Sequence, residues 1–274
     1  MNHSGDFHVH TNFCPHGTED LMEEYIEKAI KKGLNCLSFT EHAPLPESFQ
    51  DPAPGNDSSM TFEVFEAYLK KGYQLKEQYK KEININIGLE VDYIEGHERE
   101  TTRFLNDYGA VIEDAILSVH MLKTPDDNYV CLDYSADEFG KISSIFGSVD
   151  AVYEKYYQTL KQAIASDLGK NKPTRMGHVT LIEKFSRKYP PVQSYNHEIT
   201  IILDMIKSRN YQLDVNSAGL FKEHCQASYP PLDWINKASN LGIPLVPGSD
   251  SHKSDHLTRG FDSLPYLEYS CPQR

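Results

Sequence analysis

The chain has 274 residues, of which 39% are hydrophobic and 24% are charged, and its formal net charge at pH 7 is −13. A chain of this size and composition can build a proper core, either as one large α/β domain or as two small ones. Its apolar stretches are only as long as strands, so we expect no membrane span. The acidic balance argues against nucleic acid as a partner, because nucleic-acid-binding proteins usually carry a basic patch.

The first residues and the cysteines indicate the compartment. Met1 to Asp6 show neither the basic nor the apolar region of a secretory signal, so we expect a cytoplasmic protein. The five cysteines are odd in number and have no CxxC spacing, which disfavours a disulfide framework or a zinc ribbon. Cys14 lies two residues before His16, and we expect a small side chain packed under a site rather than a ligand.

Short apolar runs alternate with amphipathic stretches along the chain. The predicted strands cover residues 6–10, 35–40, 83–91, 115–119, 175–179, 212–216 and 243–246. The predicted helices cover residues 19–32, 61–81, 98–108, 148–168, 194–209 and 232–240. Gly33 is a favourable stop for the first helix, and Ser148 is the expected N-cap of the fourth. Such alternation predicts a parallel sheet, and closure into a barrel would bring all strand ends to one rim.

Two long segments are inserted between the predicted strands and helices. Residues 43–57 follow the second strand and contain four prolines. Long loops in compact domains are usually functional or disordered, so we predict a lid loop over residues 43–60 rather than a plain connector. The polar segment 123–137 is predicted as a second loop that borders the site. Since no Ser/Gly linker separates the units, we predict a single domain over residues 1–274.

Ligand-type residues stand at or just after most of the predicted strand ends, where their side chains can converge. These residues are His8, His10, His16, His42, Glu90, His120, His178, Asp250 and His252. Alternate strand residues point to the same side, so His8 and His10 can hold one metal. Imidazoles and carboxylates are the usual ligands of Zn, Mn and Fe, so the first prediction is metal-dependent hydrolysis. Glu41 should point away from His42, and Asp6 and Asp92 should be structural or support the ligands.

The order of these motifs resembles that of the polymerase-and-histidinol-phosphatase (PHP) superfamily, and the resemblance extends from His8 to His252. Cys14-Pro15-His16-Gly17, Thr40-Glu41-His42-Ala43-Pro44-Leu45-Pro46 and Leu213-Asp214-Val215-Asn216 resemble its histidinol-phosphate phosphatase branch. The resemblance implies an α/β fold, a distorted (β/α)7 barrel similar to a TIM barrel, with a trinuclear metal site at the C-terminal ends of the strands.

The resemblance also implies three divalent ions of Zn, Mn or Fe and a division of the ligands among them. The first ion would take His8, His10, Glu90 and Asp250. The second would share Glu90 and add His120 and His178. The third would take His16, His42 and His252.

A catalytic hypothesis follows for a phosphate monoester. Two metal ions ~3.5–4 Å apart can activate a water and clamp the phosphoryl oxygens. We expect Glu90 to bridge the first two ions, and Asp250 or His252 to protonate the leaving alkoxide. The substrate implied by the resemblance is L-histidinol phosphate, which would be hydrolysed to L-histidinol and phosphate in histidine biosynthesis.

Substrate contacts outside the metals are expected from cations near strand ends and from one amide. The candidates are Arg175, Lys184, Arg187, His256 and Arg259 for the pocket and its phosphate, and Asn216 for the amino-alcohol and imidazole end. Each cation could instead be an ordinary surface charge.

Three other functions are compatible with the pattern. A nuclease or phosphodiesterase of the same superfamily would need an electropositive groove, which the acidic balance disfavours. A broad phosphomonoesterase would share the metals but not the substrate preference. A non-catalytic metal-binding domain of a polymerase-like assembly is disfavoured because no expected ligand is missing.

Overall fold

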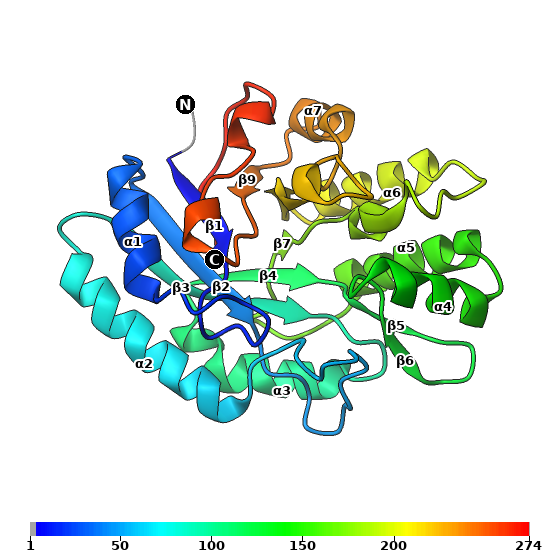
Figure 1. The fold of residues 1–274 in the computed structure, drawn as a ribbon, viewed down its shortest axis with the longest axis horizontal. Helices are drawn as coiled ribbons and strands as arrows, with labels where there is room; N and C mark the ends of the chain where they lie inside the picture. Colours follow the sequence, from blue (N-terminus) through cyan, green and yellow to red (C-terminus); the bar gives the residue numbers. More distant parts are fainter. Residues whose placement is uncertain (1–3, 274) are drawn as a thin grey trace.

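A computed structural model describes residues 4–273 (Figure 1). Seven parallel strands form one sheet in the order β1-β2-β3-β4-β7-β8-β9. Their bounds are β1 Gly5–Val9, β2 Cys36–His42, β3 Asn84–Asp92, β4 Asp114–Ser118, β7 Arg175–Met176, β8 Gln212–Asn216 and β9 Leu245–Gly248. This confirms the predicted barrel-like α/β fold. The single-domain prediction also covers residues 1–3 and 274, which lie outside the described residues.

The barrel is nearly closed between its first and last strands. Val9 and Ser251 form a parallel bridge, where His10 N donates to Ser251 O at 2.9 Å and Ser251 N donates to His8 O at 3.4 Å. Figure 1 shows β1 beside β9 and the helices arranged around the strands. Closure matters for function because it brings the carboxyl end of β1 next to the segment that follows β9.

Helices cover the outside of the sheet. Their bounds are α1 Met22–Lys31, α2 Phe62–Tyr79, α3 Glu98–Tyr108, α4 Ala136–Phe146, α5 Val149–Ala165, α6 Asn196–Ser208 and α7 Leu232–Asn240. Short 3₁₀ helices are η1 Gly109–Val111, η2 Leu181–Phe185, η3 Ala218–Phe221, η4 Ser254–His256 and η5 Phe261–Ser263. The Ser148 side chain caps α5 by accepting from Ala151 N at 3.1 Å, as expected. Gly33 follows α1 with φ of +75°, a conformation that suits glycine.

The segment predicted as a polar loop, residues 123–137, is structured instead. A short antiparallel hairpin of β5 (Met121–Lys123) and β6 (Tyr129–Cys131) is followed directly by α4. Ser135 caps α4 by accepting from Glu138 N at 3.1 Å. The segment does border a cavity, as predicted, through Cys131 and Asp133. Its strands and α4 were not predicted because each strand has only three residues and α4 is separated from α5 by two residues, so neither gives a long periodic pattern.

The core is one large apolar cluster between the sheet and the helices, with a smaller cluster under the loop that follows β2. That smaller cluster includes Phe49, Ala53, Ile94, Met121 and Cys131. It anchors the irregular segment 43–60 next to the hairpin. Within residues 4–273, no helix is both long and apolar enough to cross a membrane.

Candidate metal centre

The nine predicted ligand residues converge at the carboxyl ends of the strands, around Glu90. Glu90 Oε1 lies 2.8 Å from His178 Nε2 and 3.7 Å from His120 Nε2. Its other oxygen, Oε2, lies 3.2 Å from His42 Nδ1, 3.3 Å from His8 Nε2 and 3.4 Å from His10 Nε2. The Ser118 hydroxyl also donates to Oε1 at 2.6 Å and fixes the carboxylate. Glu90 is therefore the one carboxylate that faces five imidazoles among the described residues.

Two groups of potential ligands share Glu90. His8, His10 and Glu90 bring their ligand atoms within 4.8 Å of one another, and so do Glu90, His120 and His178. Asp250 Oδ1 lies 3.5 Å from His10 Nε2 and 3.8 Å from His8 Nε2, which adds it to the first group. The groupings match the predicted first and second metal sites.

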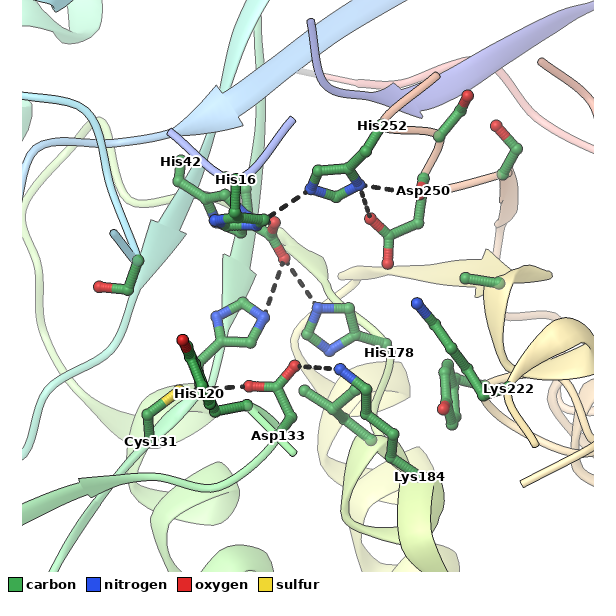
Figure 2. A pocket seen from close by; sticks show the side chains of 18 of the residues that line it. His16, His42, His120, Cys131, Asp133, His178, Lys184, Lys222, Asp250 and His252 are labelled. Carbon is green, nitrogen blue, oxygen red and sulfur yellow. Dashed lines mark hydrogen bonds and ion pairs between the residues drawn. The ribbon is translucent and has the colours of Figure 1, made fainter. Parts of the chain in front are cut away.

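The third predicted set also comes together. His16 Nε2 and His252 Nε2 lie 3.2 Å apart, and the ring centroids of His16 and His42 are 5.1 Å apart (Figure 2). Cys14 is buried, and its sulfur is within 4.8 Å of ligand atoms of His10, His42 and His252. Burial raises the pKa of the Cys14 thiol and favours its neutral form, which agrees with a packing role.

Carboxylates and imidazoles lie close together in the cluster and shift one another's pKa values. Burial alone would raise the pKa of Glu90, but His8, His42 and His120 hold it well below its usual range. Burial opposes protonation of His10, yet Glu41 and Glu90 raise its pKa to about 9. Burial and then the charge of His10 lower the pKa of His42.

The donor set fits bound divalent cations. Both ring nitrogens of His10 and Nδ1 of His42 are buried without a hydrogen bond, and buried polar atoms normally have a partner. The facing nitrogens of His16 and His252 likewise suit a cation between imidazoles. Imidazole nitrogens with carboxylate oxygens are ligands for Zn, Mn and Fe.

Carboxylates on the far side of the histidines support them. Asp214 Oδ2 lies 3.0 Å from His8 Nδ1, Asp92 Oδ1 lies 2.7 Å from His120 Nδ1, and Glu41 Oε2 lies 3.7 Å from His10 Nδ1. Glu41 thus lies against His10, and Asp92 lies against His120. Asp214 was not predicted as a site residue, although Asp214 and Asn216 share one side of β8 and the alternation could have revealed it.

Gly248 allows this packing at the end of β9. A Cβ at Gly248 would lie 2.4 Å from His8 Cβ and 3.0 Å from Asp214 Oδ1, which real side chains do not tolerate. Asp250, two residues later, has φ of +51°, an unusual backbone conformation for a non-glycine residue that is often found at functional sites. The turn from Gly248 to Asp250 therefore places Asp250 against β1.

A cavity of about 410 Å³ opens above the cluster. Residues His16, His42, Glu90, His120, His178, Asp250 and His252 line it, together with Lys184, His256 and Arg259 from the list of substrate candidates. Three residues of segment 43–60, namely Ala53, Asp57 and Ser58, also border the cavity. His16 Nδ1 donates to Asp57 O at 2.8 Å, which ties this segment to the third group.

Three substrate candidates lie elsewhere. Arg175 is buried under the site, where Nη2 donates to Phe7 O and to Asp114 Oδ2, each at 2.9 Å. Asn216 is fully buried, donates to Asp250 Oδ2 at 3.2 Å and accepts from Ala218 N at 2.9 Å. Arg187 is exposed and does not line the cavity. These placements correct the expectation that Arg175, Asn216 and Arg187 reach into the pocket.

Two pocket residues were missed in the sequence. Lys222 follows η3, and Figure 2 shows its amino group directed into the cavity. Asp133 follows β6 and accepts from Lys184 Nζ at 2.8 Å. Burial would raise the pKa of Asp133, but the charge of Lys184 lowers it. Neither residue lies at the end of a barrel strand, so the pattern that revealed the histidines gave no signal for them.

Comparisons with known proteins show the family of this chain. A family model described as PHP domain matches residues 6–218. The histidinol-phosphatase of Bacillus subtilis is 42% identical over 262 residues, which cover 94% of this chain and 97% of that protein.

Solved structures show the same fold. The Listeria monocytogenes protein HisK, assigned as a histidinol phosphatase, matches with a TM-score of 0.90 and 38% identity, over 96% of this chain and 100% of that one. The Lactococcus lactis histidinol phosphate phosphatase, solved with zinc, L-histidinol and phosphate, matches in fold with a TM-score of 0.66 and 20% identity, over 92% and 87% of the two chains. The chain therefore belongs to the PHP family.

Proposed function

We propose that this chain is a metal-dependent phosphomonoesterase that hydrolyses L-histidinol phosphate to L-histidinol and phosphate in histidine biosynthesis. The observation that carries the proposal is the cluster of nine ligand-type residues, with Glu90 facing five of its histidines, in a chain 42% identical to a histidinol-phosphatase over nearly its whole length. A biosynthetic role would place the protein in the cytoplasm.

The proposed cofactors are three divalent ions, with the ligands divided among them as the resemblance implies. His8, His10, Glu90 and Asp250 would hold the first, Glu90, His120 and His178 the second, and His16, His42 and His252 the third. Zinc is the first metal to test because the Lactococcus structure contains it, with manganese and iron as alternatives. When bound, such ions lower the pKa of water and polarise phosphoryl oxygens.

The residues of the chain then have distinct roles. Glu90 offers one oxygen to each of the first two groups, so it would hold their spacing. Asp250 and His252 are the candidates to deliver a proton to the leaving alkoxide, since both line the cavity and their side chains lie 3.7 Å apart. Asn216 would hold Asp250 in place through its amide.

Cations on the wall opposite His42 would bind the phosphorylated substrate. Lys222 and Arg259 line the cavity, and neither is in an ion pair with a carboxylate among the described residues. The Arg259 guanidinium lies over the Phe221 ring at 3.6 Å and Nη1 is 3.4 Å from His256 Nε2. Unpaired cations beside a cavity favour a dianionic ligand, and the net charge of −13 disfavours nucleic acid as the ligand.

The loop 43–60 would act as a lid. It borders the cavity at Ala53, Asp57 and Ser58 and contacts His16 through a carbonyl. Its base is fixed by the Phe49 cluster, and its tip carries the groups that face the site.

Phosphate release from a substrate panel tests the proposal. Histidinol phosphate, several other phosphomonoesters and one diester would be compared on the same metal-analysed sample. We expect histidinol phosphate to give the highest kcat/KM. Equal turnover of all monoesters would show a broad phosphomonoesterase, and preference for the diester would support a phosphodiesterase.

A further inference from the structure

We propose that Asp214 and Asp92 are positioning residues that act separately, Asp214 on the first metal site through His8 and Asp92 on the second through His120. The inference rests on the proposed metal centre. It assigns to each carboxylate one histidine ring and one ion.

Asp214 lies on β8, on the far side of the His8 ring from Glu90. Its Oδ2 is 3.0 Å from His8 Nδ1, while His8 Nε2 is 3.3 Å from Glu90 Oε2. This distance suits a hydrogen bond in which a His8 ring with its one proton on Nδ1 donates that proton to Oδ2. The lone pair of Nε2 is then left for a cation on the Glu90 side.

Asp214 has no other role visible in its contacts. It is fully buried, and within residues 4–273 its carboxylate has one hydrogen bond, to His8, while Oδ1 has no partner. The nearby Asp114, by contrast, is paired with Arg175 at 2.9 Å. Among residues 4–273 no Lys or Arg pairs with Asp214, so the His8 ring is the partner that its position serves.

Asp92 repeats the arrangement at the end of β3. Its Oδ1 is 2.7 Å from His120 Nδ1 and also accepts from His120 N at 3.3 Å. The outer nitrogen, His120 Nε2, is 3.7 Å from Glu90 Oε1, the oxygen that belongs to the second group. Asp92 and Asp214 therefore reach opposite oxygens of Glu90 through different histidines.

If Asp214 and Asp92 act on different metal sites, substitutions of each, alone and combined with substitutions of the histidines, can test the proposal. Asp214→Asn and Asp92→Asn keep side-chain size but remove the obligatory acceptor, since an amide can turn its NH₂ toward the ring. Each should weaken the binding of one zinc ion by ~10–100-fold, measured as zinc retained per folded chain against a competing chelator. Asp204→Asn, an exposed residue on α6, is the matched control and should bind zinc as the wild type does.

The background variants identify which ion is affected. Asp214→Asn should cause no further loss of zinc affinity when added to His8→Ala, but a further 10–100-fold loss when added to His120→Ala. A further loss in the His8→Ala background, or wild-type affinity of Asp214→Asn, would overturn the inference. Wild-type protein that binds no divalent metal would instead refute the proposed function itself.

A measurement without variants covers the case in which a substituted chain does not fold. Nitrogen-15 spectra of the histidine rings in the zinc-loaded wild type should show His8 and His120 protonated at Nδ1 and ligated at Nε2. Zinc ligation through Nδ1 of either ring would contradict the assignment.

Discussion

Arg175 and Asp114 form an ion pair inside the barrel, with Arg175 Nη2 2.9 Å from Asp114 Oδ2 and both side chains 1% exposed. Breaking a buried pair by removal of one partner leaves an uncompensated charge. Arg175→Met should therefore lower the free energy of unfolding by ~3–5 kcal/mol in urea titrations. The KM of the folded fraction should stay within a few-fold of wild type, since the guanidinium does not reach the cavity. Unchanged stability with a large rise in KM would restore Arg175 as a substrate residue.

Glu90→Gln tests the centre of the site. The amide keeps the volume of the side chain but removes the charge that faces five imidazoles, so we expect fewer bound metals and a loss of kcat of ~10³-fold or more. Circular dichroism should show the fold retained. Glu66→Gln, an exposed substitution on α2, is the control. Near-wild-type turnover with full metal content would refute the role of Glu90.

Lys222→Met tests the cation that the structure adds to the pocket. Loss of a charge-assisted contact to a phosphate should raise KM for the monoester by about tenfold or more, with little change in metal content. Lys188→Met is the matched control, because Lys188 is paired with Asp137 and does not line the cavity. Equal kinetic effects of the two substitutions would argue against a substrate contact at Lys222.

Much of the site could be predicted because its ligands follow the strands. His8 lies near the end of β1 and His10 follows it, Glu90 lies near the end of β3, and His120 and His178 follow β4 and β7, so parallel topology alone brings them to one rim. Lys222 and Asp133 lie in irregular segments, where no periodicity tells which way a side chain points.

Arg175 shows a second reason why a side chain can be placed wrongly from the sequence. Its position in a short strand before His178 was visible in the sequence, but its direction depended on a buried partner, Asp114, that lies on a different strand. The α4 helix was missed for a similar reason. It packs against the following helix, α5, and its sequence has no long stretch of helical hydrophobic periodicity. Tertiary partners, not local propensity, decide such positions.

The free energy of unfolding should depend on pH because of the buried carboxyl group of Glu183 on η2. Burial raises its pKa from 4.5 to about 7, so between these values the folded chain keeps a proton that the unfolded chain releases. Stability should therefore fall as the pH rises through this window, by ~1–3 kcal/mol. Glu183→Gln removes the penalty and should melt higher than wild type at pH 8 but similarly at pH 4.5. An equal difference between the two proteins at both pH values would contradict this account.

Asp51 tests the link between the lid loop and His16. Its carboxylate accepts from Ala53 N at 2.8 Å and from Ser58 N at 3.0 Å, and so closes the tip that presents Asp57 O to His16. Asp51→Ala should speed hydrogen exchange over residues 51–58 and weaken the binding of one metal ion. Glu47→Ala, an exposed change in the same loop, should do neither. Faster hydrogen exchange with unchanged metal affinity would show that the loop does not support metal binding at the third site.

Phosphate release before and after removal of metal tests the central claim most directly. Protein treated with a strong chelator and then desalted should lose activity toward histidinol phosphate in proportion to its loss of divalent metal, and added zinc, manganese or iron(II) should restore it. Full activity in a sample shown by elemental analysis to be free of divalent metal would contradict the claim that the Glu90 cluster is a metal centre that performs the reaction.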